Sequence, residues 1–312
     1  MEYVWLIVGF VLLVKGADFF VDGASSIAAK LKVPSLIIGL TVVSMGTSLP
    51  EAAVSVSASL SGNNSISLGN VIGSNVFNLL VVVGVSSIIL PIVSDRDILR
   101  RDMPISIAMT AVLGLMLLDG KLSRVDAGIL LVLLAAYMFI LIRSALKNRT
   151  ESPDQKKLSW TKSVIFALVG VASIIGGGQL VVNSAKTIAA SLGMGETLIG
   201  LTVVAIGTSL PELVTSIVAA KKGDSGIAMG NAVGSNIFNI LFILGLAGVI
   251  KPMTADTAFF IDSGILIAVS AMMLLFAFTK KKTSRVEGAI AVSVYVVYTA
   301  YIIMRAYSIW IF

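Results

Sequence analysis

Hydrophobic residues run along this chain in long stretches that short polar segments separate. Each stretch approaches the roughly 17–25 residues that an α-helix needs to cross a bilayer. Because the stretches are continuously apolar and do not alternate, they predict helices and exclude a membrane β-barrel. Ten spans are expected, at residues 3–27, 33–59, 66–92, 103–119, 125–142, 162–189, 195–219, 226–250, 257–279 and 286–309.

Two of these spans are interrupted by nearly the same polar sequence. "VVSMGTSLPEAAVSV" occupies residues 42–56, and "VVAIGTSLPELVTSI" occupies residues 203–217. A carboxylate inside a membrane span costs several kcal/mol, and ionisable residues there usually mark a functional site. Glu51 and Glu212 are therefore the first candidates for a functional role.

A proline precedes each of the two glutamates and is expected to break its helix. Pro50 and Pro211 have no N–H to donate to the preceding turn. The backbone carbonyls at Ser44 to Gly46 and at Ala205 to Gly207 are therefore expected to lack helical partners. Broken backbone at membrane depth is tolerated only where protein or a water-filled cavity satisfies it, so both breaks are expected to face inward.

The second half of the chain repeats the first at a constant offset, which aligns Glu51 with Glu212 and Asn78 with Asn239. Residues 31–51 and 192–212 are identical at 13 of 21 positions, and residues 69–78 and 230–239 at seven of ten. Five spans per half is an odd number, so the second half must enter the membrane inverted. Inverted repeats are typical of secondary transporters, which bind their substrate near the midplane. The predicted fold is an all-α membrane protein of two inverted five-helix repeats, at 1–145 and 162–312, joined by a short linker at 146–161.

Hydroxyl and amide side chains share helix faces with the carboxylates. Thr47 lies four residues before Glu51, with Ser48 beside it, and the next helix places Ser74 and Asn78 four residues apart. The second half supplies the equivalent residues Thr208, Ser209, Glu212, Ser235 and Asn239. All these groups bind through oxygen, which suits hard cations such as Na⁺ and Ca²⁺, whereas zinc, copper or iron would call for His or Cys.

Composition agrees with a membrane protein, and the charge distribution indicates its topology. The chain is 57% hydrophobic and 13% charged, with no His and no Cys. Seventeen of the 23 Lys and Arg residues fall in one set of alternating loops and five in the opposite set. The positive-inside rule then places both termini outside the cell and the linker in the cytoplasm. The expected partner is the lipid bilayer of the cell membrane, with no nucleic acid and no cofactor.

Other polar residues have structural or undecided interpretations. Lys15, Asp18 and Asp22 lie on one face of the first helix, where an internal ion pair is expected. Asn75 and Asn236 either orient the ion ligands or form hydrogen bonds between helices.

The motif "GTSLPE", present twice and each time followed by "GN-x-x-GSN-x-FN", resembles the α-repeats of the sodium/calcium exchanger family. The resemblance covers essentially the whole chain and implies ten helices, with the second, third, seventh and eighth around the ions. It also implies exchange of Na⁺ for Ca²⁺. The ligands implied by this resemblance are Glu51, Glu212, Thr47, Ser48, Thr208, Ser209, Ser74, Asn78, Ser235 and Asn239, with backbone carbonyls near Ser44 and Ala205.

Several functions compete at this point. Some relatives carry Asp at the position of Asn239, and the amide here argues against coupling to K⁺. An H⁺/Ca²⁺ antiporter on the same scaffold is the alternative, since protonated Glu could replace bound Na⁺.

An intramembrane enzyme would need a Ser with a His or Lys base, paired aspartates or an Asp-rich diphosphate site, so no enzyme activity is expected. A passive channel is disfavoured by two inverted Glu motifs at one depth. The exchanger is expected to function as a monomer.

Overall fold

The computed structural model describes residues 1–62, 64–147, 158–193, 205–255 and 257–306. Its first half consists of α1 (Glu2–Leu31), α2 (Ser35–Ile38), the π-helical η1 (Gly39–Val43), α3 (Ser44–Thr47), α4 (Leu49–Leu60), α5 (Asn64–Phe77), the π-helical η2 (Asn78–Val82), α6 (Val83–Ile89), β1 (Ile92–Val93), the π-helical η3 (Ile98–Asp102), α7 (Met103–Met116), the 3₁₀ turn η4 (Leu117–Asp119), β2 (Lys121–Leu122) and α8 (Arg124–Lys147).

The described elements of the second half follow a similar order, without counterparts of η3 and η4. It consists of α9 (Trp160–Ser191), α11 (Ala205–Thr208), α12 (Leu210–Lys221), α13 (Ser225–Phe238), the π-helical η6 (Asn239–Leu244), α14 (Gly245–Ile250), β3 (Met253–Thr254), α15 (Thr257–Lys280), β4 (Lys282–Thr283) and α16 (Arg285–Ala306). The sequence repeat is therefore also a repeat of secondary structure: α4 and α12, and likewise α5 and α13, start at equivalent positions of the two repeats.

Helices long and apolar enough to cross a membrane dominate the fold. Within the described ranges eight such helices are present, or nine if the bent pair Ser35–Thr47 and Leu49–Leu60 counts as one span. The expected seventh span, 195–219, lies partly outside the described residues, and its described part is α11 and α12. The chain is thus an all-α, multi-pass membrane protein, as its hydrophobic pattern predicts.

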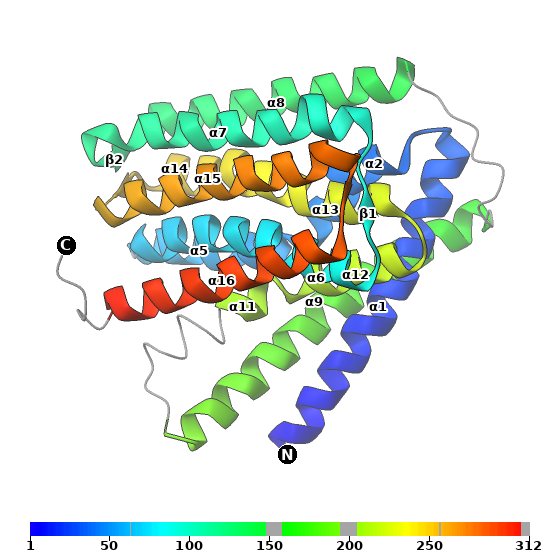
Figure 1. Cartoon of the computed structure of the whole chain (residues 1–312). Helices are drawn as coiled ribbons and strands as arrows, with labels where there is room; N and C mark the ends of the chain where they lie inside the picture. The colour runs from blue at the N-terminus through cyan, green and yellow to red at the C-terminus, as the bar shows by residue number, and fades with distance from the viewer. Residues whose placement is uncertain (63, 148–157, 194–204, 256, 307–312) are drawn as a thin grey trace.

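Two short antiparallel strand pairs join the halves and were not predicted. Strand β1 pairs with β4 through Ile92 and Thr283, and β2 pairs with β3 through Leu122 and Met253. Each pair combines a strand of one half with a strand of the other, and the two pairs lie at opposite ends of the bundle (Figure 1). Strands of two residues have too little pattern to be recognised from sequence, so their absence from the prediction has a simple cause.

Helices α1 and α9 run antiparallel against each other and project from the rest of the bundle (Figure 1). Glycines permit the contact. A Cβ at Gly170 would lie 2.5 Å from the Phe20 backbone nitrogen, and one at Gly16 would lie 2.9 Å from that of Ile174. Small residues of this kind let membrane helices approach closely.

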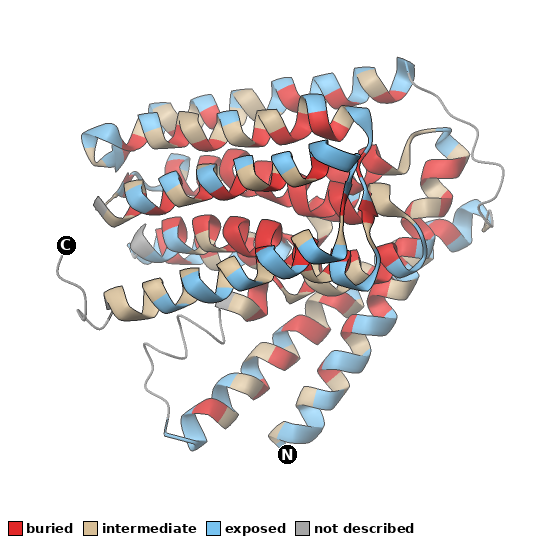
Figure 2. Ribbon diagram, in the orientation of Figure 1, coloured by how far each residue is buried: buried red, intermediate tan, exposed pale blue. Residues whose placement is uncertain are grey.

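Burial is concentrated in the two central spans, Ile66–Ile89 and Ser225–Ile250, where 72% and 78% of residues are buried. The outer spans Arg124–Lys147 and Arg285–Arg305 are only 22% and 11% buried, consistent with contact to lipid (Figure 2). The central spans nevertheless carry the polar residues of the two "GN-x-x-GSN-x-FN" segments, at 69–78 and 230–239. Their polar groups must therefore find partners inside the protein or bind a ligand.

Candidate ion-binding site

The polar motifs lie where their helices break. Helix α3 ends at Thr47, Ser48 leaves the helical region with φ −83° and ψ 7°, and α4 continues at an angle of 49°. Ser209, between α11 and α12, has the same geometry, with φ −92° and ψ 7°. Both breaks directly precede their prolines, as expected from the missing N–H.

One detail of the predicted break is wrong. The Ser44 carbonyl is not free of helical partners, because it accepts a hydrogen bond from the Ser48 N–H at 3.0 Å. The helix therefore keeps this α-helical bond, and it breaks at Ser48, shortly before Pro50, as expected. The Thr47 hydroxyl also lies 3.3 Å from this carbonyl oxygen, so the Ser44 carbonyl has two neighbouring donors. Ala205 is the first residue of α11, and the residues just before it lie outside the described ranges.

Glu51 and Glu212 are completely buried, and each accepts a hydrogen bond from the opposite half. Ser209 lies 2.9 Å from Glu51 Oε1, and Ser48 lies 2.9 Å from Glu212 Oε1. The second oxygen of each carboxylate, Oε2, is buried and has no hydrogen-bond partner among the residues that the structure describes. Sequence alone did not show that each motif serine serves the other half's glutamate.

The absence of a basic partner distinguishes these two carboxylates from the other buried ones. In the part of the chain that the structure describes, Asp102 and Asp262 are also buried, but Arg101 lies 2.8 Å from Asp102 and Arg305 lies 2.8 Å from Asp262. Glu51 has no such ion pair, and neither does Glu212. A buried carboxylate is costly unless it is paired or binds a metal. The two glutamates are therefore candidates for cation ligands, and the two aspartates are structural.

Two amide oxygens repeat this pattern. Asn78 and Asn239 are buried at the first residues of η2 and η6, and within the described ranges the Oδ1 of each has no hydrogen-bond partner. Their Nδ2 groups are occupied: Asn78 donates to Asn236 Oδ1 at 3.1 Å, and Asn239 donates to Asn75 Oδ1 at 3.0 Å. Of the buried side-chain oxygens that have no hydrogen-bond partner among the described residues, four are not hydroxyls: two come from carboxylates and two from amides. Such a set suits Ca²⁺ or Na⁺.

Two of the remaining predicted residues, Ser74 and Ser235, contact side chains of this site, and the two threonines are buried on the neighbouring helices. Ser74 lies 3.1 Å from the Ser209 hydroxyl, and Ser235 lies 3.5 Å from Glu212 Oε1. The Thr47 hydroxyl is within 2.9 Å of Asn231 Oδ1 and 3.1 Å of the Val43 carbonyl. Thr208 is nearly buried at the end of α11.

The sequence analysis missed one supporting pair of residues, Asn70 and Asn231. Asn70 donates to the Glu51 carbonyl at 3.3 Å and to Ser55 at 3.0 Å; Asn231 donates to the Glu212 carbonyl at 3.2 Å and to Ser216 at 3.0 Å. These bonds connect each Glu-bearing helix to the following helix. The signal was available, because all four positions are identical in the two repeats.

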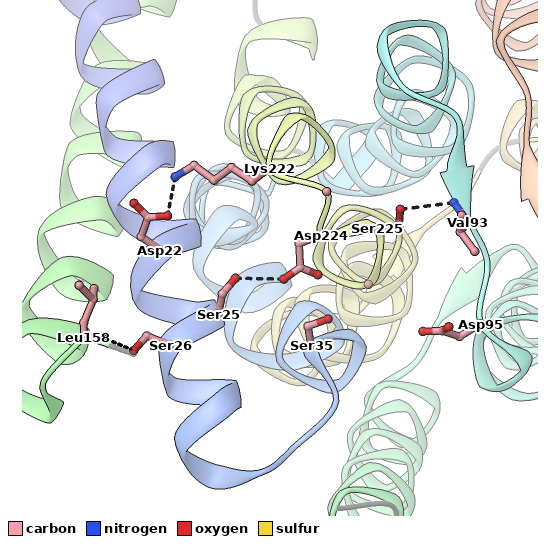
Figure 3. A pocket seen from close by; sticks show the side chains of 12 residues that line it. Asp22, Ser25, Ser26, Ser35, Val93, Asp95, Leu158, Lys222, Asp224 and Ser225 are labelled. Carbon is pink, nitrogen blue, oxygen red and sulfur yellow. Dashed lines mark hydrogen bonds and ion pairs between the residues drawn. The ribbon is translucent and has the colours of Figure 1, made fainter. Parts of the chain in front are cut away.

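A separate polar pocket of about 880 Å³ opens at the end of the bundle that carries β1 (Figure 3). There Lys222 contacts Asp22 at 2.7 Å and Asp18 at 3.4 Å, and Ser25 donates to Asp224 at 3.0 Å. The expected ion pair within the first helix is therefore wrong. Asp18 and Asp22 pair with Lys222 of the second half, and not with Lys15. The long lysine side chain reaches across because the turn after α12 packs beside α1. Partial burial and the nearby carboxylates of Asp97 and Asp224 raise the pKa of Asp95 at this pocket.

Comparison with known proteins agrees with this geometry. The family model described as "Sodium/calcium exchanger protein" matches residues 1–143 and again 162–304. The chain is 34% identical over 346 residues to the sodium/calcium exchanger MaX1 of Methanosarcina acetivorans, covering 96% of this chain and 97% of that protein. It is 37% identical over 307 residues to the inner membrane protein YrbG of Escherichia coli, covering 95% and 94%.

Solved structures of the sodium-calcium exchanger NCX_Mj have the same fold. A structure soaked with zero Na⁺ and Ca²⁺ has a TM-score of 0.85 and 33% identity, covering 96% of this chain and 98% of that one. A structure soaked with 2.5 mM Na⁺ and 0.1 mM Ca²⁺ has a TM-score of 0.84 and 32% identity, covering 96% and 97%. With both halves matched and the whole fold shared, the chain belongs to the sodium/calcium exchanger family of membrane transporters and is not an enzyme.

Proposed function

We propose that this protein is a secondary antiporter that exchanges Na⁺ for Ca²⁺ across the cell membrane by alternating access. The observation that carries the proposal is the group of four buried oxygens without donors, in which two carboxylates lack any basic partner among the described residues. One divalent cation would neutralise both carboxylates, and Na⁺ ions would do the same singly. Oxygen-only ligands match both ions.

The proposed ligands are the residues of the two motifs. Glu51 and Glu212 supply the charge, and Asn78 and Asn239 supply neutral oxygens. The remaining proposed ligands are Thr47, Ser48, Ser74, Thr208, Ser209 and Ser235, with the carbonyls of Ser44 and Ala205.

The proposed architecture has ten spans in two inverted repeats, 1–145 and 162–312, with the linker 146–161 in the cytoplasm and both termini outside. Two observations support it. Equivalent elements recur at the offset of the sequence repeat, and β1 pairs with β4 at one end of the bundle, as expected if the loops at 93–97 and 280–285 share a side. Each chain contains a complete ligand set, so we propose that a monomer suffices for exchange.

The relatives favour Na⁺ as the coupling ion. MaX1 is named a sodium/calcium exchanger, and the NCX_Mj structures were soaked with Na⁺ and with Ca²⁺ or Sr²⁺. Proton coupling is the alternative, because two buried carboxylates that accept hydrogen bonds from serine hydroxyls could also bind protons.

The test is uptake of radioactive Ca²⁺ into proteoliposomes containing the purified protein, with the Na⁺ gradient, pH gradient and K⁺ concentration varied independently. We expect uptake when the vesicles are loaded with Na⁺ and diluted into Na⁺-free buffer at equal pH, with no requirement for K⁺. Uptake driven by a pH gradient without Na⁺ would identify H⁺/Ca²⁺ exchange instead. If neither the Na⁺ gradient nor the pH gradient drives Ca²⁺ against its own gradient, antiport is refuted.

A further inference from the structure

Two buried asparagines, Asn75 and Asn236, connect the two halves of the protein at its centre. Asn75 lies on α5 and donates from Nδ2 to the Asn236 carbonyl at 3.0 Å. Asn236 lies on α13 and donates from Nδ2 to the Asn75 carbonyl at 3.1 Å. Both residues are almost fully buried, so these bonds are sheltered from water.

The same two side chains also contact the amides of Asn78 and Asn239, and the contact crosses between halves. Asn75 Oδ1 accepts from Asn239 at 3.0 Å, and Asn236 Oδ1 accepts from Asn78 at 3.1 Å. Each asparagine therefore serves the amide of the opposite repeat, although its own repeat carries an equivalent amide only one helical turn away.

The direction of every bond in this network follows from two backbone carbonyls. A carbonyl can only accept, so the end of Asn75 that faces the Asn236 carbonyl must be its NH₂ group. Its other end is then the oxygen, which can only accept, so Asn239 must present its own NH₂ group there. The Oδ1 of Asn239 therefore takes no part in this network. It is one of the buried oxygens that have no hydrogen-bond partner among the described residues.

We infer that Asn75 and Asn236 are positioning residues of the proposed ion site. Asn75 holds the Asn239 amide, and Asn236 holds the Asn78 amide, so that each presents its oxygen to the cation and not its NH₂ group. An amide turned end for end would point N–H donors at a cation and lose its buried hydrogen bond. This inference rests on the proposed function, because it names what orients two of the proposed ligands.

The network also restricts the charge of the site. An ionised Asp at position 239 would set a carboxylate oxygen against Asn75 Oδ1, where the present N···O distance is 3.0 Å and no proton would lie between the two acceptors. Turning Asn75 around would relieve that contact but would cost its bond to the Asn236 carbonyl. Asn75 and Asn236 therefore favour an amide over an ionised carboxylate at positions 239 and 78. The proposed site then contains two carboxylates, those of Glu51 and Glu212.

A purely structural role is the competing explanation, because the two backbone contacts also tie α5 to α13. The two roles predict different patterns of coupling between substitutions. If Asn75 acts by orienting Asn239, its effect on Ca²⁺ binding requires Asn239 and is independent of Asn78, its neighbour on the same helix. If Asn75 only joins the two helices, its substitution should weaken Ca²⁺ binding equally whether or not Asn239 or Asn78 has been replaced.

The experiment is a pair of double-mutant cycles on purified full-length protein, with equilibrium binding of radioactive Ca²⁺ as the measurement. We expect Asn75→Leu to weaken binding about tenfold, or about 1.4 kcal/mol, in the wild type and in Asn78→Ala. In Asn239→Ala the same change should weaken binding less than about twofold. The mirror cycle should couple Asn236→Leu to Asn78→Ala and not to Asn239→Ala.

Asn70→Leu is the matched control, since Asn70 is an α5 asparagine that donates to a backbone carbonyl but contacts neither Asn78 nor Asn239. Its effect should be equal in both backgrounds. Equal effects of Asn75→Leu in both backgrounds, or wild-type binding by it, would overturn the inference. If Asn75→Leu does not yield monodisperse protein, Asn75→Ala and the mirror cycle at Asn236 decide the same question. Direct Ca²⁺ binding does not require Na⁺ coupling, so failed antiport and failed positioning give distinguishable results.

Discussion

The most informative single substitution is Glu51→Gln. It retains the shape of the side chain and removes one of the two charges that the proposed Ca²⁺ site contains. In the native protein Ser209 holds Oε1 at 2.9 Å, and Oε2 is the oxygen without a donor. If the glutamine oxygen takes the Ser209 contact, its NH₂ group replaces Oε2 and points N–H donors at the cation. If it turns around, only a neutral oxygen faces the cation.

The size of the effect can be bounded from charge. Two unit charges about 4 Å apart interact by about 4 kcal/mol at an effective dielectric constant of about 20, and a divalent ion doubles this value. The amide dipole and the lost repulsion with Glu212 offset part of it. A net loss of about 3 kcal/mol remains a conservative expectation, which weakens Ca²⁺ binding at least about 100-fold.

The assay is Na⁺-driven uptake of radioactive Ca²⁺ into proteoliposomes, together with Ca²⁺ binding to the same purified protein. Asp102→Asn is the matched control, because it neutralises another completely buried carboxylate that pairs with Arg101 at 2.8 Å. The control should change thermal stability while Ca²⁺ affinity stays within about threefold of wild type. A correctly folded Glu51→Gln protein with near-native Ca²⁺ affinity would refute the assignment of Glu51 as a ligand.

Three further predictions concern topology, protons and the structural aspartates. Ser61 and Lys280 are both exposed at helix ends. A single cysteine at position 61 should react with an impermeant thiol reagent added outside the cell, and one at position 280 only with reagent added inside. Labelling of both from outside would contradict the proposed topology. If Glu51 and Glu212 bind Ca²⁺ as proposed, protons should compete with Ca²⁺ for their carboxylates. The half-saturating Ca²⁺ concentration for uptake should then rise as pH falls, by up to about tenfold per pH unit where one proton is displaced; an affinity that does not change with pH would argue against this competition. Arg101→Ala leaves Asp102 buried without its charge partner and should cost about 3 kcal/mol of stability, measured by thermal unfolding in detergent. The double variant Arg101→Met, Asp102→Leu should recover most of this lost stability.

Several features of this protein were determined by the sequence by itself. The spans follow from continuous apolar stretches, because a bilayer admits little else than helices whose backbone groups bond internally. The repeat follows from motifs that recur at one constant offset, and its proposed inversion from an odd number of expected spans per half. The candidate ligands follow from the cost of burying Glu51 and Glu212 without a nearby basic residue. The break before Pro50 was also predictable, because a missing N–H is a local property.

Only the tertiary structure decided which groups meet across the two halves. Ser48 bonds to Glu212 and Ser209 to Glu51, Asn75 serves Asn239, and Lys222 displaces Lys15 as the partner of Asp22. Each repeat carries an equivalent copy of the site residues, so sequence spacing cannot say whether a side chain bonds within its own half or to the other. That choice depends on how α5 packs against α13 and how the turn after α12 packs against α1, and long-range packing of this kind leaves no local pattern along the chain.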